Sequence, residues 1–337
     1  MTFNVSKVKS PMPALCLISR SLSKTKMTRI AFLNNTAGNA TLLARELNKK
    51  NHTTDVFVFG DKGYRQWGGN KINFGFIRKE PLGRAVINPF WKITRWKLAR
   101  NLNNYKVWHY QSPSGALERW IVKRASGHIL VKHYNGSDLR GRLDNGACVV
   151  STPDLLSYAP NGTWIKDPID LNYINQFKKE VEHEIPRVAH YPYYLSSPRL
   201  AKDEEIYRPA LTNLQKRGKC QVVNFINQTH EKTIQMLAEC DIVVGKVMPD
   251  VGWFGKFEVE GMILGKRVMA YVAKDLFDKY KPPIHNTSKA TFEKDLEALI
   301  EDKSEQKRLI QEGYRYATYH DATNVATEIE LFYQKLM

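Results

Sequence analysis

The arrangement of apolar runs in residues 29–59 constrains the fold more than any other feature of the chain. This stretch reads RIAFLNNTAGNATLLARELNKKNHTTDVFVF, in which the apolar run Ile30–Leu33 precedes a loop containing Gly38. Leucines at helical spacing follow, and a second apolar run completes a strand–helix–strand unit. Further β-like runs, with helix-length pieces between them, lie at 105–110, 128–134 and 148–152. The pattern predicts a mainly parallel sheet with helices on both faces.

The same alternation of strands and helices resumes after Pro186, following a polar stretch. The expected elements of this half are a helix at 203–217, a strand at 220–226, a helix at 230–239 capped by Thr229, a strand at 241–245, a short acidic helix and a strand at 267–272. The remainder is mostly helical and ends in a helix at about 322–336. We therefore expect an α/β chain of two doubly wound, Rossmann-like units divided near residue 185, with residues 1–26 as a mobile N-terminal tail.

Composition limits the partners and the compartment. The 51 Lys and Arg residues against 34 Asp and Glu give a formal net charge of +17, which favours nucleic acid, an anionic membrane face or phosphorylated substrates as partners. The four cysteines have no C-x-x-C spacing, so we expect neither a zinc site nor a disulfide framework, and a reducing, cytoplasmic compartment. No apolar run reaches the roughly 18–20 residues of a membrane span.

The segment 252–261, GWFGKFEVEG, is the clearest candidate for a site, because open α/β sheets bind ligands beyond the carboxyl ends of their strands. The free amides of a helix beginning after Gly255, together with Lys256, suit an anion such as a diphosphate. Glu258 and Glu260 cannot share one face of a helix, and we expect Glu260 to face the ligand. The alternative is that both carboxylates only complement the helix dipole.

The stretch 252–272, GWFGKFEVEGMILGKRVMAYV, resembles the donor-site motif E-A-M-A-x-G-x-P-V of retaining GT-B glycosyltransferases of the group 1, family 4-like clan. The resemblance implies that Glu260 binds the ribose hydroxyls of a nucleotide sugar. It also implies that the backbone at Gly255, Lys256 and Phe257 holds the diphosphate, with Glu258 in the same nucleotide-sugar site. Where the family has a first acid, eight residues before Glu260, this chain has Gly252, with Asp250 nearby.

Other segments extend the resemblance to about residues 28–336. The piece RVAHYPYYLSSPRLAKDEE, 187–205, resembles the opening of the family's donor domain, so Arg199 and Lys202 are expected to bind the diphosphate and stabilise the leaving nucleotide. The turn at Phe225 resembles the base-binding turn. The strand HILVKHYNGSDLRG, 128–141, resembles one ending in T-x-H-G-x-D, which would place His133 beside the reacting sugar; a buried structural histidine is the alternative. Gly38 and Asn39 form the expected acceptor-side turn.

The resemblance implies a GT-B architecture of two Rossmann-like domains facing a cleft. Residues 27–185 would form the acceptor-side domain, 186–318 the nucleotide-sugar donor domain and 319–337 a helix that packs back on the first domain. The implied activity is transfer of a hexosyl group from a nucleotide-diphosphate sugar to a glycan or lipid-linked acceptor, with retention of configuration. The sequence gives no sign of a D-x-D metal motif at a strand end, and we expect no metal and no cofactor besides the donor substrate.

A basic, aromatic stretch precedes the strand at 105–110 and predicts an amphipathic helix suited to an anionic lipid surface. Its expected membrane or acceptor contacts are Arg78, Lys79, Trp91, Lys92, Arg95, Trp96 and Lys97. This interpretation places the protein peripherally on the inner face of the membrane. The alternative is a solvated helix whose tryptophans enter the core.

Two other functions stay open on the sequence alone. Basic charge with aromatic residues also suits single-stranded nucleic acid, although no RNA-binding signature is present. The replacement of the family's first acid by Gly252 is compatible with a sugar-nucleotide-binding protein that has lost transfer. A steep salt dependence of oligonucleotide binding would identify the first alternative.

Overall fold

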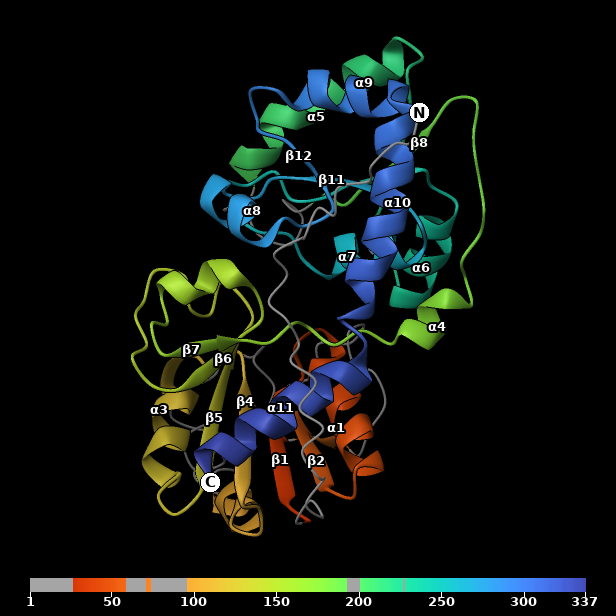
Figure 1. The fold of residues 1–337 in the computed structure, drawn as a ribbon. Coiled ribbons are helices and arrows are strands. Elements are labelled where there is room, and N and C mark those ends of the chain that lie inside the picture. Colours follow the sequence, from red (N-terminus) through yellow and green to blue (C-terminus); the bar gives the residue numbers. More distant parts are fainter. Residues whose placement is uncertain (1–26, 59–70, 74–95, 193–200, 227) are drawn as a thin grey trace, which may run out of the picture.

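A computed structural model describes residues 27–58, 71–73, 96–192, 201–226 and 228–337 (Figure 1). The side chains of residues 71–73, 116 and 201–206 are not described. Several residues singled out in the sequence lie outside the described part: the tail 1–26, Arg78, Lys79, Trp91, Lys92, Arg95 and Arg199.

The first sheet has seven strands, and all of its described strand pairs are parallel. The strands are β1 (Arg29–Leu33), β2 (Thr53–Val58), β3 (Lys71–Asn73), β4 (Val107–Gln111), β5 (Ile129–Tyr134), β6 (Cys148–Val150) and β7 (Gly162–Trp164). Their order is β3-β2-β1-β4-β5-β6-β7. This is the doubly wound order, and it confirms the parallel sheet expected from the apolar runs.

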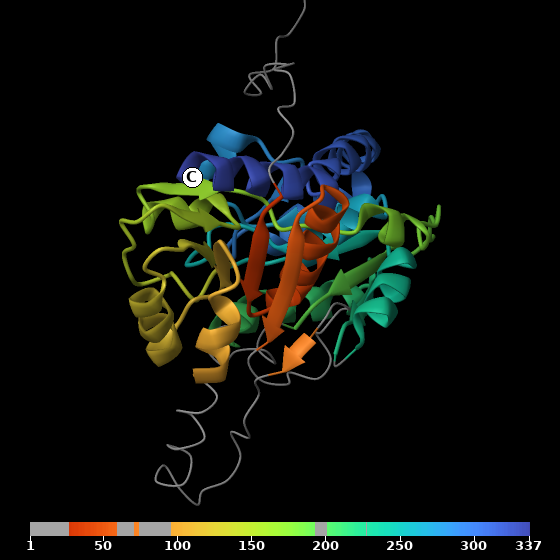
Figure 2. The same ribbon diagram turned by 90° about the horizontal axis from the view of Figure 1, so that it is seen from below.

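Helices cover both faces of the first sheet because β1 alternates its apolar side chains between them. On one face Ile30 and Phe32 pack with α1 (Asn39–Lys49) and with α11 (Ala322–Leu336). On the other face Ala31 and Leu33 pack with a helix at 96–102 and with α3 (Gly115–Arg124). Figure 2 shows α11 and α3 on opposite sides of these strands. The C-terminal helix therefore crosses back to the first sheet, as expected.

The second sheet has five parallel strands in the order β12-β11-β10-β8-β9. The strands are β8 (Arg187–His190), β9 (Gln221–Asn224), β10 (Ile242–Val244), β11 (Arg267–Ala270) and β12 (His285–Asn286). One face packs on α6 (His230–Ala238), α7 (Lys256–Ile263) and α10 (Lys303–Thr318); the other packs on α5 (Ala201–Lys216) and α9 (Phe292–Glu301). The second doubly wound unit is thus also confirmed.

The two sheets and their helices form two lobes, the first around β1–β7 with α11 and the second around β8–β12 (Figure 1). Two chain segments connect them side by side. The Ile169 amide donates to the His320 carbonyl at 2.8 Å, and the Ala322 amide donates to the Ile169 carbonyl at 2.9 Å. Helix α4 (Leu171–Asn175) follows the first crossing segment, and α11 starts directly after the second. We call the region where the lobes meet the lobe junction.

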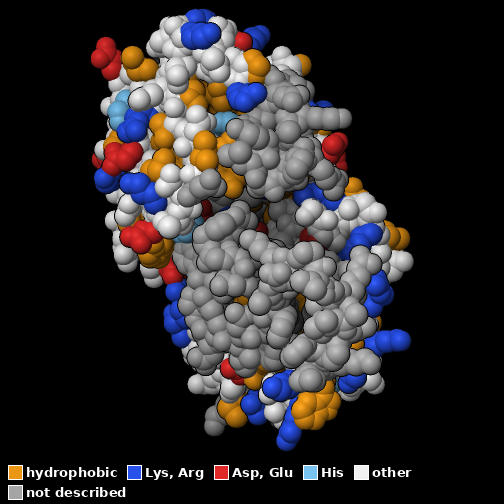
Figure 3. Space-filling view, turned by 180° about the vertical axis from the view of Figure 1, so that it is seen from behind, with side chains coloured by type: hydrophobic (Ala, Val, Ile, Leu, Met, Phe, Trp, Pro, Cys, Tyr) orange, Lys and Arg blue, Asp and Glu red, His pale blue; other side chains and the backbone are white. Residues whose placement is uncertain are grey.

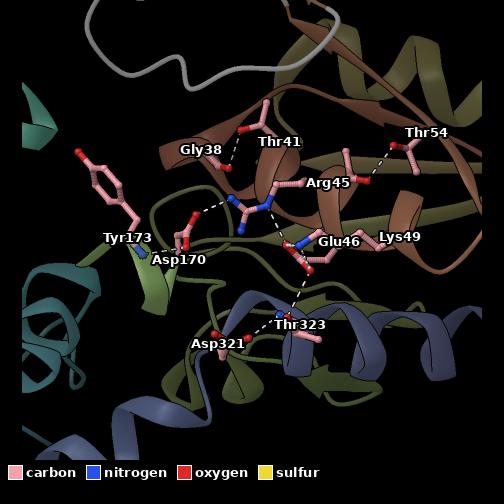
Figure 4. A network of polar contacts seen from close by, with 11 residues as sticks. Gly38, Thr41, Arg45, Glu46, Lys49, Thr54, Asp170, Tyr173, Asp321 and Thr323 are labelled. Carbon is pink, nitrogen blue, oxygen red and sulfur yellow. Dashed lines mark hydrogen bonds and ion pairs between the residues drawn. The ribbon is translucent and has the colours of Figure 1, made fainter. Parts of the chain in front are cut away.

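A polar network fixes α1 against both crossing segments (Figure 4). Arg45 of α1 pairs with Asp170 beside the first segment, and buried Glu46 accepts from Arg45, Lys49 and Thr323 of α11. Burial alone would raise the pKa of Glu46, but the hydrogen bonds from Lys49 and Arg45 outweigh it and leave that pKa below its usual value. The start of α1, where the candidate site lies, is therefore held in position relative to the lobe junction.

Candidate functional site

The turn between β1 and α1 has a strained backbone, and it lies where the strand order of the first sheet reverses, between β1 and β4. Asn34, Ala37 and Gly38 all have left-handed conformations, with φ of 73°, 50° and 77°. Such conformations are costly for residues other than glycine and concentrate at functional sites. The turn follows β1, and β4 lies beside β1 although it comes later in the chain, so this is the topological switch point where doubly wound sheets bind ligands.

Uncharged polar side chains connect this turn to the ends of β4 and β5. The Thr36 amide donates to Gln111 Oε1 at 3.2 Å, and the Thr36 and Ser112 hydroxyl oxygens are 2.8 Å apart. Asn135 Nδ2, after β5, donates to Ser112 Oγ at 3.0 Å. The carboxyl edge of the first sheet is therefore a preorganised set of amides and hydroxyls.

Glu258, expected in the nucleotide-sugar site, instead holds the turn before α7. Its carboxylate is fully buried and accepts from the Gly255 amide at 3.0 Å and the Lys246 amide at 2.9 Å. A Cβ on Gly245 would lie 2.4 Å from the Glu258 side chain, so only glycine permits this approach. Because both oxygens are engaged with backbone amides, we assign Glu258 a structural role and correct the sequence prediction at this residue.

Glu260 points to the other side of α7, as the helical spacing required. Its Oε1 lies 2.8 Å from Nε2 of His230, the first residue of α6. His230 was not predicted as a site residue, although its place directly after the helix cap Thr229 is a usable signal. Lys256 lies one turn before Glu260, so a cation and a carboxylate share one side of the helix.

Lys256 crosses the lobe junction. Its Nζ donates to Asn39 Oδ1 at 2.7 Å and to the Ala37 carbonyl at 3.2 Å, both in the turn after β1. Burial lowers the pKa of Lys256, while Asp167 and Glu260 act in the opposite direction. Lys256 and the turn at Gly38 and Asn39 were both singled out in the sequence, and in the structure Lys256 contacts Asn39.

Asp167 is a second carboxylate of the junction that the sequence analysis did not name. Its Oδ1 accepts from Asn39 Nδ2 at 2.5 Å and from Ser151 Oγ at 2.9 Å. Lys246 is a second residue that was not predicted from the sequence. Its Nζ lies close to Gly255, since a Cβ placed on that glycine would be only 2.8 Å from it. Lys246 therefore brings a second cation to the N-terminus of α7.

His133 does not face the junction as its expected catalytic role required. The ring is fully buried, with Nδ1 at 2.9 Å from His109 and Nε2 at 3.1 Å from Ser151 Oγ. This matches the alternative of a buried structural histidine. If the glycine of T-x-H-G-x-D is aligned with Gly136, then Asn135 stands at the position of the family's histidine. Asp138 accepts hydrogen bonds from the backbone amides of Asn135 and Gly136. The Gly-x-Asp spacing could have given this register from the sequence.

The remaining predicted residues belong to the second lobe. Phe225 is buried and packs edge-on against Phe257, with ring centroids 5.3 Å apart. Phe257 is only partly buried, and its ring centroid also lies 5.9 Å from that of Tyr191, directly after β8. Lys202 lies in α5, but its side chain is outside the described atoms.

A small pocket lies in the junction beside Lys256. Trp164 of the first lobe and Trp253 of the second form two of its walls, their ring centroids 5.8 Å apart. His320 also lines it; burial, followed by the nearby Lys166, lowers the pKa of this ring to about 4. Gly252, just before Trp253, has a φ of 71°. This backbone conformation explains why a glycine stands where the family has its first acid.

Potential metal ligands and basic side chains are distributed as follows over the described residues. Among the described residues, no group of three or more His, Cys, Asp or Glu side chains is arranged to hold a metal ion. Trp96 and Lys97, the two described members of the predicted basic helix, are both exposed. On the described part of the face in Figure 3, Lys and Arg side chains occur on both lobes rather than in one continuous patch.

Comparisons with known proteins give the fold a name. No protein-family model matches the sequence, and no curated protein sequence matches it. Among solved structures, Anabaena HepE in complex with UDP-glucose aligns with a TM-score of 0.61 and 14% identity, over 91% of this chain and 100% of that one. Sucrose-phosphate synthase from Thermosynechococcus elongatus aligns with a TM-score of 0.60 and 12% identity, over 92% and 99%. A glycosyltransferase from Rickettsia africae aligns at 0.59 and 14%, over 92% and 99%.

These neighbours are GT-B glycosyltransferases, and the likeness extends over nine-tenths of the chain and almost all of theirs. The two parallel sheets and the returning C-terminal helix are thus a GT-B fold, as the sequence resemblance implied.

Proposed function

We propose that the chain is a glycosyltransferase that moves a hexosyl group from a nucleotide-diphosphate sugar to a glycan or lipid-linked acceptor, with retention of configuration and without a metal ion. In this proposal residues 27–185 bind the acceptor, 186–318 bind the donor, and 319–337 join the two. The observation that carries it is the placement of Lys256 and Glu260 one helical turn apart at the lobe junction, directly opposite the turn after β1.

The N-terminus of α7 supports diphosphate binding. Its first amides point out of the helix, and the side chains of Lys246 and Lys256 lie beside them. Helix dipole, free amides and cations together favour a diphosphate over a neutral ligand. In the reaction they would stabilise the negative charge that grows on the leaving nucleotide, each such donor contributing about 3 kcal/mol. Arg199 and Lys202 would help to stabilise this negative charge, and Glu260 would bind the ribose hydroxyls.

The solved neighbours suggest which donor to test first. HepE of Anabaena was crystallised with UDP and glucose and with UDP-glucose. We therefore propose UDP-glucose as the first donor to test with this protein. Asp167 and Asn135, at the edge of the first sheet, are the nearest candidates to contact the transferred sugar in place of the family's first acid and histidine.

We also propose that the first lobe docks on an anionic membrane face, which would suit a lipid-linked acceptor. Among the described helices, none is long and apolar enough to cross a membrane. The helix at 96–102 supports surface docking, because Trp96 is 60% exposed and the Arg100 guanidinium lies 5.8 Å from the centre of its ring. Exposed tryptophan beside Lys97 and Arg100 is typical of interfacial helices.

The deciding experiment is a thermal-shift series with UDP, GDP, ADP and a single-stranded oligonucleotide, followed by transfer assays with UDP-glucose. One nucleoside diphosphate at about 100 times its Kd should stabilise the protein by about 2.7 kcal/mol. The Glu260→Gln variant should lose most of that shift, and Glu293→Gln, made at an exposed site on α9, should keep it. Oligonucleotide stabilisation that disappears with salt, and none by nucleotides, would refute the proposal. Nucleotide binding with neither transfer nor donor hydrolysis would instead identify a non-catalytic binding protein.

A further inference from the structure

A continuous chain of buried hydrogen bonds runs from α11 to the carboxyl edge of the first sheet. Tyr333 Oη lies 2.6 Å from His109 Nδ1, and His109 Nε2 lies 2.9 Å from His133 Nδ1. His133 Nε2 is then 3.1 Å from Ser151 Oγ. These four side chains are at most 3% exposed, and they come from α11, β4, β5 and the end of β6.

The chain of hydrogen bonds continues to the lobe junction. Ser151 Oγ lies 2.9 Å from both Asp167 Oδ1 and Asn135 Oδ1. Asp167 also accepts from Asn39, whose amide oxygen accepts from Lys256 of the second lobe. The series of hydrogen bonds therefore begins at Tyr333 in the C-terminal helix and ends at Lys256 in the candidate site.

The chemistry of the end groups fixes the direction of every hydrogen bond. Ser151 Oγ faces two acceptor oxygens, so its single proton must point toward them, and it must accept from His133 Nε2. Burial lowers the pKa of His133 to about 4 and that of His109 well below its ordinary value, so each ring carries one proton at neutral pH. His133 Nδ1 is then bare and accepts from His109 Nε2, and His109 Nδ1 is bare and accepts from the Tyr333 hydroxyl.

The surroundings argue against a role in packing alone. Tyr333, Val131, Val149 and Val325 belong to one apolar cluster under the sheet. Two histidines inserted beside such residues are costly unless every polar atom is paired, and apolar residues would fill the same space without that cost. A series of hydrogen bonds in which every group donates toward Asp167 is instead suited to orienting the Asp167 carboxylate at its end.

We propose that Tyr333 is a positioning residue of the candidate site, which acts through His109, His133 and Ser151 to orient Asp167 at the lobe junction. The consequence for transfer rests on the proposed function, whereas the hydrogen-bond direction does not. In this proposal the packing of α11 on the first lobe controls the orientation of the Asp167 carboxylate.

The direction of the chain is tested by histidine nitrogen NMR on the full-length protein. Both His109 and His133 should carry their proton on Nε2 at neutral pH. A proton on Nδ1 of either ring would overturn the proposal, because the donors would no longer run from Tyr333 to Ser151.

The positioning role is tested with Tyr333→Phe, Ser151→Ala and the double variant. Tyr316→Phe is the matched control, because Tyr316 is partly buried and its buried hydroxyl has no hydrogen-bond partner among the described residues. With UDP-glucose as donor, Tyr333→Phe should lower kcat about tenfold and leave the donor KM unchanged, since a displaced group loses transition-state contacts more than binding. The double variant should be no slower than Ser151→Ala alone, because both act on one chain. Multiplied effects, or a Tyr333→Phe rate equal to that of the control, would overturn the proposal.

A readout at the far end separates this proposal from the proposed function. If the native protein transfers no sugar from any nucleotide-sugar donor, the proposed function fails, and the side-chain amide NMR signals of Asn39 decide the positioning role. Tyr333→Phe should shift these signals, although Tyr333 has no contact with Asn39, and Tyr316→Phe should not. Signals that stay in place in both variants would overturn the positioning role.

Discussion

Lys256 Nζ lies 2.7 Å from Asn39 Oδ1, which joins the N-terminus of α7 in the second lobe to the turn after the first strand of the opposite lobe. The same residue is the first of α7, where the proposed function expects the diphosphate. In that proposal Lys256 would contact both the donor and the first lobe.

The first prediction is that Lys256→Met weakens binding of the preferred nucleoside diphosphate about tenfold to a hundredfold. A hydrogen bond to a charged group contributes about 1.5–3 kcal/mol, and tenfold corresponds to about 1.4 kcal/mol. Isothermal titration at fixed ionic strength measures the effect. Lys274→Met, made on the exposed first residue of α8 (Lys274–Tyr280), is the control and should bind as the native chain does. Equal affinities of the two variants would contradict the role of Lys256.

The second prediction separates the two carboxylates of α7. Glu258→Ala should destabilise the fold by about 2–4 kcal/mol, because the buried amides of Gly255 and Lys246 lose their acceptor. Glu260→Ala should cost less stability, because its partner His230 is partly exposed, but it should reduce nucleotide binding at least as much as Lys256→Met. Chemical denaturation and titration on both variants measure the two effects. The reverse order of stability losses would show that the roles are exchanged.

The sequence predicted most of the helices and strands because their patterns are local, but it did not predict the short helices α4 and α8. The final helix was expected at about 322–336, and the structure has α11 at Ala322–Leu336. The short edge strands β3, β7 and β12 were missed, because two or three residues carry no measurable alternation. Each is recognised only by its pairing with the strand that precedes it in the chain.

The candidate site was predicted less completely than the fold. The helix start and the separation of Glu258 from Glu260 follow from periodicity, whereas the contact between Lys256 and Asn39 is known only from the structure. The orientation of His133 could not be read from its strand, because its ring is held by His109, 24 residues away, and His109 is in turn held by Tyr333, 224 residues from His109. Asp167 and His320 are in the junction only because the two crossing segments pair there.

The third prediction concerns the glycine that admits Glu258. Gly245→Ala should destabilise the protein by about 1–3 kcal/mol, because the new Cβ would meet Glu258 Cγ and Oε1 at 2.4 Å. It should also lower nucleotide affinity, because Glu258 positions the amide of Gly255. Gly146→Ala is the matched control, since its Cβ would meet only the Asp144 carboxylate, at 3.2 Å, on an exposed loop. A Gly245→Ala protein as stable as Gly146→Ala would mean that the turn adjusts without Glu258.

The fourth prediction is that stability falls as the pH is lowered from 6.5 toward 4. Burial lowers the pKa values of His133 and His320 to about 4 in the folded protein, against an ordinary value of 6.5. Between these values the unfolded chain binds protons that the folded chain does not, so the stability present above pH 6.5 is progressively lost on acidification. At pH 5 the loss is about 2 kcal/mol for each ring. Melting temperatures of the native chain and of His133→Gln combined with His320→Gln, from pH 7.5 to 5, measure it. The double variant should show the shallower pH dependence, with His109 supplying part of what remains, and an unchanged slope would place the acid-sensitive groups elsewhere.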